Sequence, residues 1–166
     1  MKVLAIDPGY ERLGIAVLEK DPDNGKEYWI HSETFRTMGS KEFVDRLNEI
    51  GKRLEYLIEI HKPEMLAIEN LFLSNNQKTA MRVAEVRGAI LYIARSSELE
   101  VYEYTPLQIK VAVGGHGKAD KHAVIDMTQK LVQIPKAPAG SKRLDDEYDA
   151  IACGLAHFAY YRRPQQ

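Results

Sequence analysis

The chain has 166 residues, 45% of them apolar and 28% charged, with a formal net charge of −1. This balance is typical of a folded globular protein, so it excludes a disordered chain and predicts a single domain over residues 1–166. Cys153 is the only cysteine, which excludes an intramolecular disulfide, and no run reaches the roughly 18 apolar residues of a membrane helix, so we expect a cytoplasmic protein without membrane attachment.

The first 37 residues predict three consecutive strands. Residues 2–7 form a nearly continuous apolar run that ends in Asp-Pro-Gly, and residues 13–20 form a second run, so a turn lies between them. The turn signal Asp-Pro-Asp-Asn-Gly at 21–25 precedes a third run over 28–37. Strands joined by such short turns predict an antiparallel meander.

From Ser40 onward the spacing of apolar residues changes to three and four. This predicts an amphipathic helix over 41–61, with Ser40 as its N-cap and Pro63 beyond its end. The remaining predicted elements are strands over 65–69 and 101–105 and helices over 77–96, 106–113, 120–133 and 144–161. Strands that alternate with helices predict parallel pairing in the same sheet.

Two acidic residues close apolar strands. Asp7 ends the first predicted strand and Glu69 ends the fourth. For either residue alone, simple exposure at a strand end is the better explanation. Because the carboxyl ends of parallel strands are where sites are built in such sheets, two acids on neighbouring strands favour a functional site.

Further acids stand at the start of the last predicted helix. Asp146 and Asp149 are three residues apart, and Asp145 and Asp149 are four apart, so both pairs share a helix face. This spacing does not choose between Asp145 and Asp146. Acids in a first helical turn also complement the helix dipole without any catalytic role, which is a strong alternative explanation.

Four carboxylates gathered in one place would repel one another unless cations bridged them. Two Mg²⁺ ions would balance four negative charges, and Mg²⁺ prefers hard oxygen ligands while keeping sites open for a phosphate. A pair of such ions can activate water and stabilise the leaving oxygen of a phosphodiester. The sequence therefore suggests a two-metal nuclease.

Three segments resemble motifs of the RuvC-type Holliday junction resolvases. They are AIDPG at residues 5–9, AIENLF at 67–72 and DEYDAIA at 146–152, in the same order and with the same separation across nearly the whole chain. The resemblance, like the order of predicted elements, implies the α/β ribonuclease H-like fold. We expect a mixed five-stranded sheet flanked by helices, with the first three strands antiparallel and the later strands parallel.

The resemblance also implies which residues form the site. It implies that four residues are catalytic and bind two Mg²⁺ ions, or Mn²⁺ as a substitute: Asp7, Glu69, Asp146 and Asp149. It thus favours Asp146 over Asp145 and leaves a helper role for Asp145 open. A separate general base is not identified, and His116, His122 and His157 are only candidates.

The expected DNA-contacting residues follow from the same resemblance. Phe72 corresponds to an aromatic residue that stacks on bases near the junction centre, although a core phenylalanine is an equal alternative. Gln108, Lys110, Lys118 and Lys121 correspond to a basic DNA-contacting segment, although a single lysine is more often only a solvated charge. The net charge near zero argues weakly against a DNA-binding protein, but an acidic pocket and a basic rim would cancel in the sum.

The function that the resemblance implies is the resolution of four-way DNA junctions by symmetric Mg²⁺-dependent nicking during recombination and repair. Two cuts require two sites, so we expect a homodimer, and a RuvAB-type branch-migration complex is a further suggested partner. The small residues Ala80, Ala84 and Gly88 would let the helix over 77–96 pack on its mate or, equally, on its own sheet.

Three alternatives stay open at the level of sequence. Asp7 to Gly14 also fits the DxGxxRxG pattern of YqgF-like nucleases, which process ribosomal RNA precursors, with Arg12 as the ambiguous residue. An actin-like phosphate-binding module shares DxGxxxxG, but the chain is too short for its paired domains. A catalytically inactive DNA-binding relative is disfavoured because all four acids are present.

Overall fold

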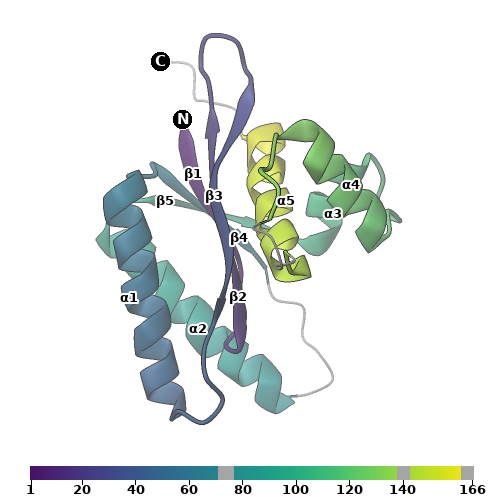
Figure 1. Cartoon of the computed structure of the whole chain (residues 1–166). Helices are drawn as coiled ribbons and strands as arrows, with labels where there is room; N and C mark the ends of the chain where they lie inside the picture. Colours follow the sequence, from purple (N-terminus) through teal and green to yellow (C-terminus); the bar gives the residue numbers. More distant parts are fainter. Residues whose placement is uncertain (71–76, 138–142, 162–166) are drawn as a thin grey trace.

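Five strands form one mixed sheet in the order β3-β2-β1-β4-β5 (Figure 1). The structure is a computed structural model that describes residues 1–70, 77–137 and 143–161. The strands are β1 (Lys2–Asp7), β2 (Arg12–Lys20), β3 (Glu27–Arg36), β4 (Met65–Glu69) and β5 (Glu100–Tyr104). β1, β2 and β3 pair antiparallel, whereas β4 pairs parallel with both β1 and β5. This confirms the predicted fold class, and every strand lies within one residue of its predicted bounds.

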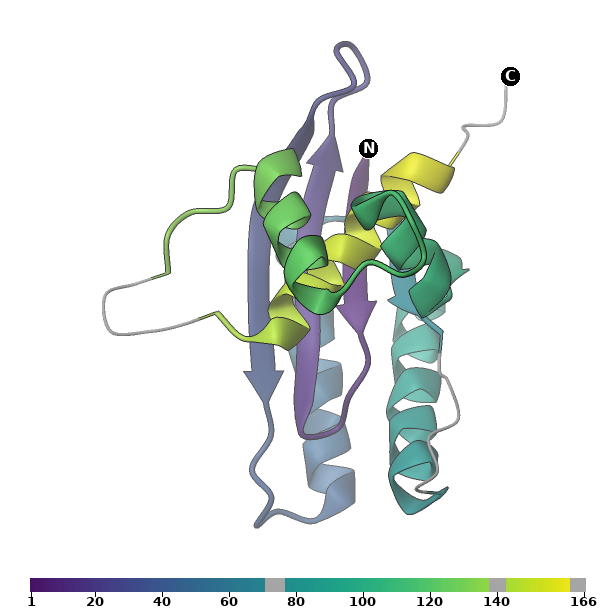
Figure 2. The same cartoon turned by 90° about the vertical axis from the view of Figure 1, so that its right-hand side faces the viewer.

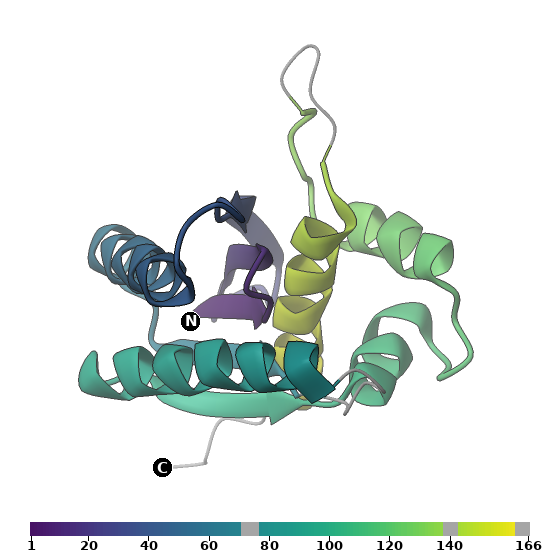
Figure 3. The same ribbon diagram turned by 90° about the horizontal axis from the view of Figure 1, so that it is seen from below.

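Helices cover both faces of this sheet. They are α1 (Phe43–His61), α2 (Gln77–Ser96), α3 (Pro106–Gly114), α4 (Lys121–Leu131) and α5 (Asp145–Tyr160). α1 and α2 cover one face, while α5 lies on the other with α3 and α4 outside it (Figures 2 and 3). Within the described ranges, no helix is long and apolar enough to cross a bilayer.

The start of α1 corrects one prediction. Ser40 is not the N-cap, because it belongs to a turn in which Lys41 N donates to Met38 O (3.1 Å). The helix begins two residues later, with Glu42 as its N-cap, and the described contacts include no side-chain hydrogen bond from Glu42 to this end. Local turn formation therefore outweighed the capping preference of serine.

Alternating side chains of the central strands build two cores. Large residues such as Leu4 and Ile68 face α1 and α2, whereas small residues such as Ala5 and Ala67 face α5. The small residues let α5 approach the sheet closely: a Cβ atom on Gly154 would stand 2.7 Å from Leu18 Cδ1. The same alternation directs the odd-numbered side chains of β1 and β4 toward α5, including the residues at the ends of these strands.

Candidate active site

Asp7 and Glu69 are brought together by the parallel pairing of β1 and β4. Ile6 is the register partner of Ile68, so the two acids follow side by side at the ends of these strands. Both have odd numbers, and both therefore point to the α5 face. Their carboxyl groups are close enough for each to shift the pKa of the other.

The N-terminal end of α5 rests on the sheet beside Asp7. Gly14 of β2 is the register partner of Asp7, and a Cβ atom on Gly14 would lie only 2.0 Å from the backbone oxygen of Asp146. Only glycine allows this approach, because any side chain would push the helix away. The approach places Asp146 and Asp149 in the electrostatic surroundings of Asp7.

The acids repel one another in a partly dry environment. Burial, followed by the charges of Glu69, Asp149 and Asp146, raises the pKa of Asp7 to about 8. Burial and the charge of Asp149 raise the pKa of Glu69 to about 7, against the lowering effect of the nearby Asp7. Burial also raises the pKa of Asp149. At neutral pH Asp7 therefore keeps its proton in the metal-free protein, because a further negative charge in the cluster is unfavourable.

Two cationic side chains contact the cluster. Lys121 Nζ lies 3.1 Å from Asp149 Oδ2 and 3.3 Å from Asp145 Oδ2. Arg12 Nε lies 3.5 Å from Asp146 Oδ2. Lys121 was predicted from the resemblance to contact DNA, whereas here it neutralises acids of the site. The contact of Arg12 was not anticipated, because no sequence pattern relates residue 12 to residue 146.

The donor set fits a hard divalent cation. Asp146 Oδ2 is buried and, within the described contacts, accepts no hydrogen bond; its ion pair with Arg12, at 3.5 Å, leaves it able to coordinate a metal ion. Carboxylate oxygens are the ligands that Mg²⁺ prefers. Across residues 1–70, 77–137 and 143–161, however, no three His, Cys, Asp or Glu side chains already stand in an arrangement that could hold a metal ion. Lys121 and a proton on Asp7 instead reduce the repulsion.

The other predicted contact residues have different surroundings. Gln108 forms a capping box at the start of α3, in which its Oε1 accepts from Thr105 N (2.8 Å) and its own N donates to Thr105 Oγ1 (3.2 Å). The spacing Thr-x-x-Gln is a signal for this cap that the sequence analysis missed. Lys110 is exposed, and its charge lowers the pKa of Glu69. Lys118 is exposed between α3 and α4, and Phe72 lies outside the described residues.

The three histidines considered as a general base differ in burial. His116 and His122 are exposed. His157 is fully buried, where its Nδ1 lies 2.9 Å from Tyr104 Oη and its Nε2 lies 3.3 Å from Met65 Sδ. Burial lowers the pKa of His157 to about 4, so it is a neutral core residue and not a general base.

Comparison with known proteins identifies the family. The family described as "Crossover junction endodeoxyribonuclease RuvC" matches residues 3–157. The RuvC of Halothermothrix orenii is 37% identical over 163 residues, which is 98% of this chain and 94% of that protein. The RuvC of Caldanaerobacter subterraneus subsp. tengcongensis is 40% identical over 157 residues, which is 95% of this chain and 92% of that protein.

A solved structure agrees with these relatives. The structure of T. thermophilus RuvC in complex with a Holliday junction substrate has a TM-score of 0.87 and 31% identity, over 96% of this chain and 94% of that one. These matches extend over nearly the whole chain, which favours the RuvC-type interpretation over the YqgF-like and actin-like ones. The chain belongs to the RuvC family of crossover junction endodeoxyribonucleases.

Proposed function

We propose that this chain resolves Holliday junctions by Mg²⁺-dependent nicking of two strands at symmetric positions. The observation that carries the proposal is the convergence of partly buried, mutually repelling carboxylates at the ends of β1 and β4, beside the start of α5. Such a cluster destabilises a protein unless a cation compensates it, and a phosphodiester-cleaving site uses that cation. Membership of the RuvC family supports four-way junction DNA as the substrate.

Asp7, Glu69, Asp146 and Asp149 would hold two Mg²⁺ ions, with Mn²⁺ as a substitute. When bound, these ions activate the nucleophile and stabilise the leaving oxygen of the phosphodiester. The chain supplies the placement of the acids: the Asp7–Glu69 pair on the sheet is rigid, and Lys121 holds Asp149 from the side of α4.

Exposed lysines of α3 and of the segment that follows it would contact the DNA backbone. Lys110 and Lys118 lie on the α3–α4 side, and Lys110 is close enough to Glu69 to affect its pKa. Phosphate contacts of this kind give salt-dependent affinity. Lys121, with two acids already as partners, would join them when a phosphate replaces one of these contacts. Stacking of Phe72 on a base and a DNA contact from Gln108 stay predictions.

An exposed face of α2 supports the homodimer. Its members are Met81, Ala84, Gly88 and Tyr92, which recur at helical spacing and are all exposed. In the part of the chain that the structure describes, nothing lies within 4 Å of a Cβ atom built on Gly88. Of the predicted stripe, Ala84 and Gly88 therefore face away from the sheet and are free to contact a second copy, whereas Ala80 is only partly exposed. A RuvAB-type partner stays a prediction.

Cleavage of a synthetic mobile four-way junction tests the proposal. With Mg²⁺ we expect paired nicks at symmetric positions on opposing strands, with ligatable 5′-phosphate ends, and no cleavage without divalent metal. Asp146→Asn should bind the junction and not cut it, whereas Asp126→Asn, an exposed change on α4, should cut like the parent. Cleavage of structured RNA without cleavage of the junction would overturn the proposal in favour of the YqgF-like activity.

A further inference from the structure

The start of α5 carries two of the proposed catalytic acids, Asp146 in the first turn and Asp149 immediately after it, but within the described ranges no side chain caps this end of the helix. Leu144 is the N-cap of this helix, and among the described contacts no side-chain hydrogen bond caps it. A side-chain cap commonly stabilises a helix start, because it accepts a hydrogen bond from one of the backbone N–H groups that have no partner within the helix. Asp146 and Asp149 therefore depend on other contacts to hold them in place.

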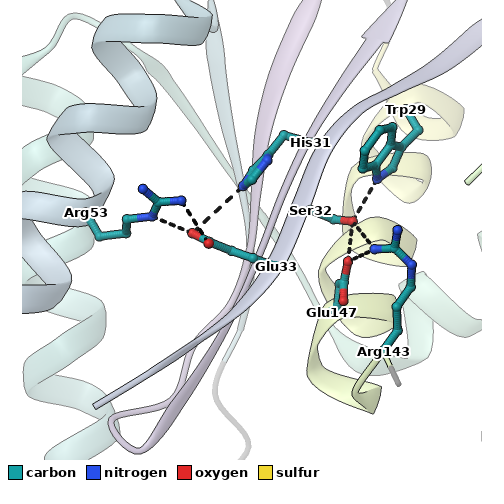
Figure 4. A network of polar contacts seen from close by, with 7 residues as sticks. All are labelled: Trp29, His31, Ser32, Glu33, Arg53, Arg143 and Glu147. Atoms are coloured by element: carbon teal, nitrogen blue, oxygen red, sulfur yellow. Dashed lines mark hydrogen bonds and ion pairs between the residues drawn. The ribbon is translucent and has the colours of Figure 1, made fainter. Parts of the chain in front are cut away.

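A polar network next to these acids provides such contacts (Figure 4). Glu147 is almost fully buried, forms an ion pair with Arg143 and accepts a hydrogen bond from Ser32 Oγ of β3 (2.5 Å). Ser32 Oγ in turn accepts from Trp29 Nε1 (2.7 Å) and from Arg143 Nη1 (3.2 Å). Arg143 Nη2 also donates to the backbone oxygen of Pro135 (3.0 Å).

The network attaches α5 to the sheet at a second point. The first point is the close approach of Asp146 O to Gly14 of β2. Glu147 is the next residue, and its side chain reaches β3 through Ser32. Two attachments on neighbouring strands fix both the position of the first turn and its rotation about the helix axis. That rotation determines where the side chains of Asp146 and Asp149 stand relative to Asp7.

We propose that Arg143 and Glu147 are a positioning pair for the catalytic acids of α5. The pair satisfies a buried carboxylate that would otherwise be costly, and it acts on the reaction only through Asp146 and Asp149. Placement within a fraction of an ångström matters, because an error of about 1 Å can reduce a rate by about 100-fold. This inference rests on the proposed function, since it takes these acids to be the catalytic ones.

The experiment uses the full chain with Glu147→Gln, Arg143→Gln and Arg143→Lys. We expect Glu147→Gln and Arg143→Gln to lower the single-turnover cleavage rate of bound junction by about 10- to 100-fold. The junction Kd should change by less than about twofold, and the Mg²⁺ concentration for half-maximal rate should rise. Arg143→Lys keeps a cation beside Glu147 and should retain most of the rate. Amide hydrogen exchange of the metal-free protein should become faster in the first turn of α5.

A matched control comes from the opposite side of β3. Glu33 accepts hydrogen bonds from Arg53 Nε (2.6 Å) and Nη2 (2.8 Å), so it forms the same kind of pair and attaches α1 to the strand. We expect Glu33→Gln to destabilise the protein without slowing cleavage. The positioning role is overturned if Glu147→Gln cuts bound junction at the parental rate, or if Glu33→Gln slows cleavage equally.

Failure of the proposed function would look different. A parent that leaves junctions uncut, or an Asp146→Asn variant that cuts them normally, refutes the assignment of the acids. The hydrogen-exchange comparison between Glu147→Gln and Glu33→Gln still tests whether the pair fixes the first turn of α5. Unchanged exchange there in Glu147→Gln overturns the positioning pair regardless of the activity.

Discussion

Carboxylates on the two faces of the sheet have opposite electrostatic environments. On the α1 face, burial alone would raise the pKa of Glu33, but the nearby His31, whose Nε2 lies 3.9 Å from Glu33 Oε1, and the hydrogen bonds and charge of Arg53 lower it to about 2. On the α5 face, burial and like charges raise the pKa of Asp7 to about 8 and that of Glu69 to about 7. Glu33 on the α1 face has a cationic partner, as Glu147 has on the α5 face, whereas the acids at the ends of β1 and β4 repel one another.

The difference separates a structural from a functional use of buried charge. Glu33 has a lowered pKa, so its contribution to stability is present above its ordinary pKa of 4.5 and is lost as the pH falls toward 2. Asp7 has a raised pKa, so the metal-free fold loses stability as the pH rises from its ordinary 3.8 toward 8. Functional sites commonly retain such unfavourable charge at the expense of stability.

The largest expected effect is on cleavage. Asp7→Asn removes a proposed metal ligand without changing the size of the side chain. We expect the rate of junction cleavage with Mg²⁺ to fall by about 1,000-fold, equivalent to roughly 4 kcal/mol, while junction binding persists. Single-turnover cleavage and a binding titration in Ca²⁺ measure the two quantities separately. Loss of binding together with cleavage would mean that Asp7 supports the fold.

The second effect is on stability without metal. The side chain introduced by Asp7→Asn cannot ionise. The free energy of unfolding of this variant should therefore be roughly 3 kcal/mol higher than that of the parent at pH 8. The difference should shrink as the pH falls toward 4, where Asp7 is protonated in the folded state. Urea denaturation in a chelator at pH 5 and pH 8 measures it. A constant difference between the two pH values would argue against repulsion as its cause.

The third effect tests the paired face. Glu33→Gln removes a charge that has an arginine partner, so it should destabilise the protein by about 1 kcal/mol at pH 7, a value reduced for partial exposure. The parent and the variant should converge as the pH falls from about 4.5 toward 2. Thermal unfolding across this range measures the convergence. A Glu33→Gln variant that is more stable than the parent would remove the contrast between the faces.

The smallest effect concerns the cations beside the acids. Lys110→Ala should weaken junction binding about threefold and lower the slope of log Kd against log salt by about 1, because one phosphate contact is lost. Lys130→Ala, an exposed change near the end of α4, is the matched control and should leave the slope unchanged. An unaltered slope in Lys110→Ala would indicate that this lysine serves Glu69 and not the DNA.

Part of the candidate site could be predicted because its signals are local. Asp7 and Glu69 close apolar runs, and the alternation of strands and helices predicted that these runs pair in parallel, as β1 and β4 do. The same local reasoning failed at Ser40 and overlooked the cap formed by Thr105 and Gln108, where turn and capping signals compete over a few residues. Spacing alone also left Asp145 and Asp146 as alternatives.

The sequence by itself determined the order of the elements and the placement of Asp7 and Glu69 at the ends of two strands, because hydrophobic periodicity is a property of short segments. The tertiary structure decided which side chains meet across long separations: Lys121 contacts Asp149, and Glu147 contacts Ser32, 115 residues away. Such pairs depend on the register of the sheet and on how closely α5 packs against it. No pattern within a short stretch of sequence encodes either of these.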